Sequence, residues 1–178
     1  TLFRSDATFN PGRPVGSRII MYNGAIVRSK SAQHSVTSDS TCAAETMEAA
    51  LASNDIAAFR FLIKELGFKM EEPTVLYQDN QAAIQVAEGC STSGHSSGSK
   101  ARHILIRVAK LAEYITDKEI HLKYCTAVQM LADLGTKFHA VKTFEFLRDM
   151  SNGYALVKFR NDGYIIPKLV YTIKDSKL

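Results

Sequence analysis

The chain has 178 residues, a formal net charge of +4 and a hydrophobic content of 46%. This composition excludes an intrinsically disordered chain, and the length is enough for one domain with a substantial core. No apolar run approaches the roughly 18 residues that a transmembrane helix needs, so no membrane partner is expected.

The first forty residues have the pattern of β-strands. Residues 2–9 form a short run of apolar and polar side chains. Residues 17–22 and 25–29 flank Asn23 and Gly24. Because an Asn-Gly pair between two such runs is a strong hairpin signal, we predict three antiparallel strands.

A long helix is predicted over residues 43–66, ending at Gly67. Its predicted buried stripe recurs at helical spacing. The stripe consists of Met47, Leu51, Ala58, Leu62 and Leu66, widened by Phe59 and Ile63.

The elements that follow alternate between strands and helices. Strands are predicted over residues 74–78 and 119–124, and helices over 81–88, 102–116, 128–135 and 141–150. Antiparallel strands that lead into βαβ units indicate an α/β fold, with a mixed sheet and helices on both faces.

We predict one catalytic domain over residues 1–153, with a Ser- and Gly-rich loop at 90–99. A C-terminal extension follows at 154–178, with a possible β-hairpin around residues 161–163. Its pattern is compatible with an added sheet edge, with pairing to a neighbouring domain and with disorder.

Four acidic residues stand at predicted strand ends or among hydrophobic neighbours: Asp6, Glu45, Asp79 and Asp133. Each alone has an ordinary explanation, such as a turn, a helix-dipole contact in the first helical turn or a solvated carboxylate. Together, such charges would repel by several kcal/mol unless cations neutralise them. Carboxylate oxygens suit Mg²⁺ or Mn²⁺, and two such ions about 4 Å apart are a known device for phosphodiester cleavage.

These acids lie in motifs that stand in a fixed order. The motifs are Leu2–Ala7, Gly16-Ser17, Ser29–Gln33, Ser40–Glu45, Tyr77–Ile84, Lys100–Ile104 and Gln129–Lys137. Over residues 2–150 the chain resembles the ribonuclease H domain that ends the polyprotein of copia-type (LTR) retrotransposons. It departs from that family at Arg4, Thr8, Leu105 and Ala109, none of which is a predicted metal ligand.

The resemblance implies a ribonuclease H-like fold with a five-stranded mixed sheet, in which the first and fourth strands are neighbours. It implies that Asp6, Glu45, Asp79 and Asp133 bind two Mg²⁺ ions, for which Mn²⁺ can substitute. The activity would be hydrolysis of the RNA strand of RNA–DNA hybrids during reverse transcription, leaving 5′-phosphate products. The expected partners are the hybrid and an adjacent reverse transcriptase domain. The expected location is intracellular, in a cytoplasmic virus-like particle or in the nucleus.

Several residues around the acids are predicted to contact substrate. Asn80 and Gln81 suit the minor groove of a hybrid, and capping by Asn80 is an equal alternative. Ser40 and Thr41 suit a phosphate at a helix N-terminus, with helix capping again the alternative. The basic corner of Lys100, Arg102 and His103 suits backbone phosphate, although His103 is also typical of a capping or core residue.

Other polar residues give weaker signals. His121, or with less support His139, is a candidate loop histidine for product release. Lys137, His139 and Lys142 form a basic edge, for which a solvated surface is the favoured interpretation.

Two other functions remain open. One is a catalytically silent or domesticated nucleic-acid-binding module, and the other is a nuclease or transposase of the same superfold that acts on DNA. Four intact acids favour the ribonuclease over the silent module. We also expect weak activity in isolation, because a charge of +4 gives little hold on a polyanion.

Overall fold

The structure is a computed structural model that describes residues 2–8, 13–22, 24–35, 37–38, 40–92 and 102–152. For residues 2–4, 6, 8, 90–92 and 102–105 it describes the backbone only. The predicted C-terminal extension at 154–178, and residues 93–99 of the predicted loop, lie outside the described residues.

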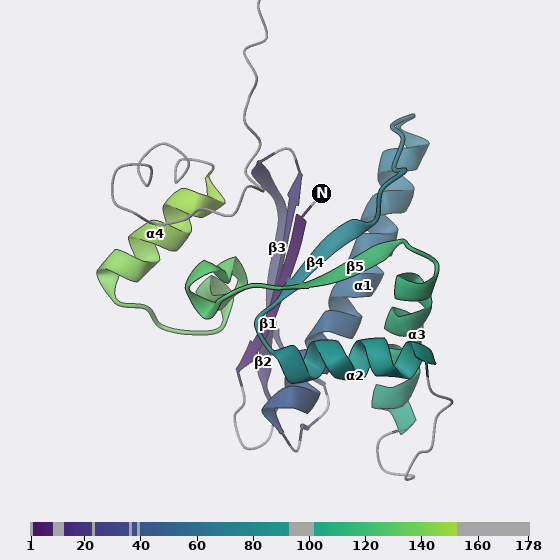
Figure 1. The fold of residues 1–178 in the computed structure, drawn as a ribbon. Coiled ribbons are helices and arrows are strands. Elements are labelled where there is room, and N and C mark those ends of the chain that lie inside the picture. Colours follow the sequence, from purple (N-terminus) through teal and green to yellow (C-terminus); the bar gives the residue numbers. More distant parts are fainter. Residues whose placement is uncertain are drawn as a thin grey trace, which may run out of the picture.

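Five strands form one sheet in the order β3-β2-β1-β4-β5. They are β1 (Leu2–Thr8), β2 (Val15–Tyr22), β3 (Ala25–Gln33), β4 (Thr74–Gln78) and β5 (Ile120–Tyr124). The first three pair antiparallel, whereas β4 is parallel to both β1 and β5. The sheet is therefore mixed, with β1 and β4 as neighbours (Figure 1).

The predicted hairpin is present between β2 and β3. Gly24 has a φ of 83°, a backbone conformation that glycine adopts without steric cost. The hairpin continues further than predicted, because β3 extends to Gln33 and pairs it with Val15.

The helices are α1 (Thr41–Glu65), α2 (Gln81–Thr92), α3 (Arg102–Thr116) and α4 (Val141–Ser151). Residues 128–135 were predicted as one α-helix, and that prediction is wrong. The structure has two short 3-10 helices there, η2 (Ala127–Gln129) and η3 (Leu131–Gly135). They turn the chain tightly enough to bury Leu131, Ala132 and Asp133 together.

Helices cover both faces of the sheet, as Figure 1 shows with α1, α2 and α3 on one side and η3 and α4 on the other. Neighbouring residues of β2 belong to different cores, because side chains alternate along a strand. Ile20 packs with Leu76 and with residues of α1, α2 and α3. Ile19 packs instead with Leu131 of η3 and Leu147 of α4.

The predicted buried stripe of α1 is only partly correct. Met47 and Ile63 are buried, but Leu62 and Leu66 are 52% and 62% exposed. The face of α1 that is buried consists largely of small residues, among them Ala44, Ala49, Ala50 and Ala52, with Ile56. Small side chains let the helix lie close to the sheet, which brings its polar residues near the strands.

None of the helices in the described part of the chain is both long and apolar enough to cross a membrane.

Candidate active site

The parallel pairing of β1 with β4 places two predicted acids at the same edge of the sheet. Arg4 is the register partner of Tyr77. Asp6 lies two residues beyond Arg4, and Asp79 lies two residues beyond Tyr77. The backbone positions of Asp6 and Asp79 are thus neighbours, although the structure does not describe the side chain of Asp6.

Glu45 reaches the same edge from α1. The helix begins at Thr41, so Glu45 lies in its second turn and not in the first turn, as predicted. Its carboxylate is buried, with 4% of the residue exposed. Oε1 accepts a hydrogen bond of 3.1 Å from the backbone N–H of Ala7, the residue after Asp6.

Gln78, the last residue of β4, joins the elements that carry Glu45 and Asp79. Its side chain is buried, with 1% of the residue exposed. Nε2 donates to the backbone oxygen of Glu45 at 3.3 Å, and Oε1 accepts from the backbone N–H of Asp79 at 2.9 Å. The sequence analysis did not single out Gln78, since glutamine at a strand end carries no specific signal.

Asp133 comes to the site on η3, which is attached to β2 and β3. Gly135 approaches Ser17 so closely that an added Cβ would overlap the serine side chain. Ser31 donates from Oγ to the backbone oxygen of Gly135 at 2.5 Å. Because Ser17 is the register partner of Asp6, this attachment brings the Asp133 segment alongside the end of β1.

The carboxylate of Asp133 is buried and bonded to a lysine. Lys137 Nζ lies 3.0 Å from Asp133 Oδ1, and the side chains are 40% and 8% exposed, respectively. His139 Nε2 lies 3.0 Å from the backbone oxygen of Asp133, whereas His121 is exposed on β5. Of the two candidate loop histidines, His139 is the one that contacts the Asp133 segment.

An open pocket of about 690 Å³ lies where these elements meet. Its lining includes Thr41, Glu45, Asp79, Gln81, Tyr124 and Lys137. Asp133 is not part of the lining, but its partner Lys137 is. Glu45 and Asp79 therefore line the pocket directly, and Asp133 is linked to it through the ion pair with Lys137.

The donor set around this pocket suits a hard divalent cation. The acidic side chains of its lining, Glu45 and Asp79, carry carboxylate oxygens. Oxygen is the ligand atom that Mg²⁺ and Mn²⁺ prefer. Among the described side chains no three His, Cys, Asp or Glu residues are grouped closely enough to hold a metal. The side chain of Asp6 is not among them.

The predicted substrate residues divide into three groups. Ser40 and Asn80 cap helices, since Ser40 Oγ accepts from the N–H of Ala43 and Asn80 Oδ1 accepts from that of Ala83. Thr41 and Gln81 are exposed and line the pocket, and Asn80 lines it as well as capping its helix. The third group is the basic corner. Lys100 lies outside the described residues, and for Arg102 and His103 only the backbone is described.

Tyr124 is a pocket residue that was not among the predicted site residues. Ile120 and Leu122 of β5 are buried, but Tyr124 is 46% exposed. It is the last residue of β5 and pairs with Gln78 at the end of β4. Because this position depends on the pairing of β4 with β5, no local sequence pattern indicated it.

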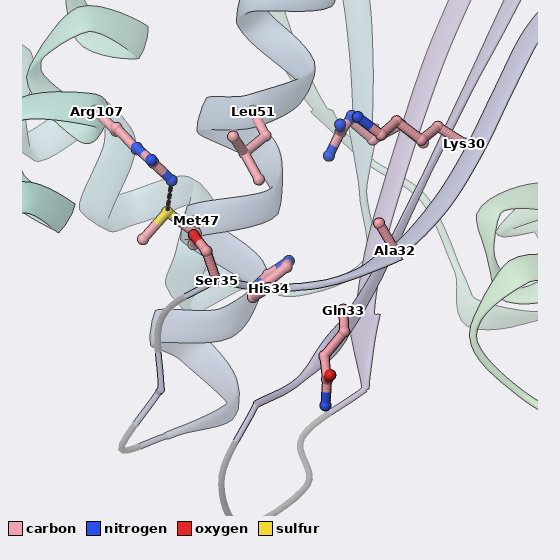
Figure 2. Close-up of a pocket in the computed structure, with 9 residues that line it drawn as sticks. Lys30, Ala32, Gln33, His34, Ser35, Met47, Leu51 and Arg107 are labelled. Atoms are coloured by element: carbon pink, nitrogen blue, oxygen red, sulfur yellow. Dashed lines mark hydrogen bonds between the residues drawn. The ribbon is translucent and has the colours of Figure 1, made fainter.

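A second pocket, of about 190 Å³, lies between α1, α3 and the end of β3 (Figure 2). Arg107 points toward Met47 in this view, and its Nη1 is 3.3 Å from the methionine sulfur. Lys30 approaches from the opposite side. No Asp or Glu lines this pocket, so it lacks the ligands for a divalent cation.

Known structures resemble this fold at low sequence identity, whereas no protein-family model matches the chain. LC11-RNase H1 in complex with an RNA/DNA hybrid superposes with a TM-score of 0.53 at 12% identity, over 75% of this chain and 91% of that chain. A second structure of LC11-RNase H1, isolated from compost by a metagenomic approach, gives 0.50 at 12% identity, over 75% and 89%. RNase H1 from Halobacterium salinarum NRC-1 gives 0.49 at 16% identity, over 75% and 92%.

Identities of this size carry no information about activity, because one fold hosts many chemistries. The two LC11-RNase H1 superpositions do identify the architecture. The chain has a ribonuclease H-like α/β fold.

Proposed function

We propose that this chain is a metal-dependent ribonuclease H that hydrolyses the RNA strand of RNA–DNA hybrids. The observation that carries the proposal is the open pocket in which Glu45 and Asp79 meet beside the end of β1. Bringing carboxylates together at one strand edge costs free energy unless a cation compensates for it. Carboxylates held together despite this unfavourable free energy are typical of active sites.

The proposed ligands of two Mg²⁺ or Mn²⁺ ions are Asp6, Glu45, Asp79 and Asp133. When bound, a metal pair supplies activation of the attacking water and stabilisation of the leaving 3′ oxygen, which leaves a 5′-phosphate. The protein holds the Glu45 carboxylate through the Ala7 amide and the backbone of Asp79 through Gln78 before substrate arrives.

Residues on the rim of the pocket are suited to the nucleic acid. Gln81 is exposed beside Asp79, where its amide can donate to 2′-hydroxyls and base edges in the minor groove. The half-exposed ring of Tyr124 offers an apolar surface to a sugar or base. Thr41 presents a hydroxyl at the N-terminus of α1, where an anion is favoured.

The proposed biological setting is a copia-type retrotransposon, in a virus-like particle or in the nucleus. The support is the order of motifs in the sequence. In that setting an adjacent reverse transcriptase domain would hold the hybrid, and we expect the isolated chain to be a weak nuclease for the same reason.

The test is a cleavage assay on the purified chain with Mg²⁺ or Mn²⁺ and three substrates: RNA–DNA hybrid, duplex RNA and duplex DNA. Only the RNA of the hybrid should be cut, and Asp79→Asn should abolish cleavage. Asp117→Asn makes the same change at an exposed aspartate after α3 and should leave the rate unchanged. Hybrid binding without cleavage in either metal would indicate the silent module, and cleavage of duplex DNA would indicate a DNA nuclease.

A further inference from the structure

The candidate active site contains a positively charged side chain, that of Lys137. Lys137 lies four residues after Asp133, and its Nζ is 3.0 Å from Asp133 Oδ1. The backbone of the two residues is also joined, since Lys137 N–H donates to the Asp133 oxygen at 3.0 Å. The lysine is therefore held in place by the same turn that carries the acid.

Lys137 also faces the other carboxylates. It lines the pocket that Glu45 and Asp79 line, so its positive charge is placed among the proposed metal ligands. Asp133 is largely removed from water, and an opposite charge at hydrogen-bond distance offsets much of the cost of that burial.

We infer that Lys137 is a positioning residue that holds the Asp133 carboxylate in place when no metal is bound, and that it competes with the divalent cation for that carboxylate. The inference rests on the proposed function. A lysine suits this task because its compact ammonium occupies one position near a carboxylate, and its flexible stem allows it to withdraw. Its side chain is 40% exposed, so there is room for that withdrawal toward solvent.

Two consequences follow from this arrangement. The metal must displace the lysine from Asp133 or share the carboxylate with it, so its affinity is lower than the acids alone would give. Removing the lysine should strengthen metal binding and at the same time destabilise the metal-free protein.

The experiment measures Mn²⁺ affinity in the absence of substrate, from the electron paramagnetic resonance signal of free Mn²⁺. Lys137→Met should bind Mn²⁺ roughly tenfold more tightly than the wild type, because a like charge close to the metal is removed. Lys137→Arg keeps the charge and should stay near the wild-type affinity. Lys30→Met removes a lysine from the pocket that no acid lines, and should also leave the affinity unchanged.

Thermal unfolding gives a second readout that needs no activity. Without metal, Lys137→Met should melt below the wild type, and saturating Mn²⁺ should reduce that difference. In an Asp133→Asn background, Lys137→Met should lower the melting temperature by less than it does in the wild type, because the ion pair is already absent. Equal or weaker Mn²⁺ binding by Lys137→Met would overturn the inference.

Failure of the proposed function gives a different pattern. If wild type and Asp79→Asn bind Mn²⁺ alike, the pocket is not a metal site and both proposals are wrong. If Asp79→Asn loses Mn²⁺ binding while Lys137→Met matches the wild type, only the role of Lys137 is wrong.

Discussion

The buried side chain of Gln78 connects the segments that carry Glu45 and Asp79. Gln78 uses both ends of its amide, one toward the backbone of α1 at Glu45 and one toward the backbone of Asp79. Both contacts are with main-chain atoms, so they fix where the chain runs beneath the carboxylates. Gln78 thereby links the fold to the geometry of the site.

Replacing Gln78 with leucine keeps most of the volume and removes both hydrogen bonds. We expect the free energy of unfolding to fall by about 1–3 kcal/mol, because one buried and one half-buried backbone group each lose a hydrogen bond. Urea unfolding measures this change, with Gln85→Leu on the exposed side of α2 as the control. A loss no larger than that of Gln85→Leu would show that Gln78 does not join the elements.

Arg18 of β2 joins the sheet to α1 through buried charges. Its Nη1 lies 2.6 Å from Glu48 Oε1, and its Nε lies 2.8 Å from Asp55 Oδ2. Glu48 also contacts the buried His34 at 2.5 Å. Burial acts to lower the pKa of Arg18, but the charges and hydrogen bonds of Glu48 and Asp55 outweigh it and raise that pKa. A raised pKa means that stability is lost only at pH above the ordinary arginine range, so Arg18 contributes throughout neutral pH.

Arg18→Met should lower the free energy of unfolding by about 3–5 kcal/mol, because it leaves Glu48 buried without its main cation. Arg13→Met, at an exposed arginine, should have almost no effect. Chemical denaturation of both variants makes the comparison. The double variant Arg18→Met/Glu48→Leu should regain much of the loss, and equal stability of Arg18→Met and the double variant would contradict this account.

The position of η3 depends on close packing against the sheet. It lies against β2 and β3 through Gly135, and it carries Asp133 toward the end of β1. The contact with Ser17 leaves no space for a Cβ at residue 135. The fourth acid is thus placed by the close approach of backbone to sheet, and a side chain at Gly135 would move it.

Gly135→Ala should destabilise the protein by about 1–3 kcal/mol through overlap with Ser17, and should lower hybrid cleavage as Asp133 shifts. Gly89→Ala is the matched control, because nothing lies within 4 Å of an added Cβ there and alanine favours a helix. Its stability should be unchanged or slightly raised. Unfolding and cleavage measurements on both variants test this, and equal behaviour of the two would refute the proposed packing of η3.

At the scale of the whole molecule, the sequence predicted most elements because their signals are local. The short apolar-polar run predicted β1, and Asn23-Gly24 predicted the hairpin of β2 and β3. The neighbouring position of β1 and β4 depends on contacts distant in the chain, so it followed from the family resemblance alone. The 3-10 helices and the exposed Leu62 and Leu66 were not predictable, because tertiary packing overrides helical periodicity there.

In the candidate site too, residues in local motifs were predicted, whereas residues that depend on contacts between distant segments were not. Asp79 and Glu45 were found because they stand in recognisable motifs, and the pocket brings both together. Gln78, Tyr124 and the ion pair of Lys137 with Asp133 depend on how distant segments meet. No local pattern distinguishes a pocket lysine from one on a solvated edge, which is why Lys137 was assigned to the surface.

The measurement that tests the central claim most directly is a crystal structure of the chain soaked with Mn²⁺, with anomalous scattering recorded at the manganese edge. The account predicts two manganese peaks about 4 Å apart in the pocket, bounded by Asp6, Glu45, Asp79 and Asp133. Asp79→Asn should lose at least one of them. The absence of any manganese peak in this pocket, in a crystal that holds the ion elsewhere on the protein, would contradict the account.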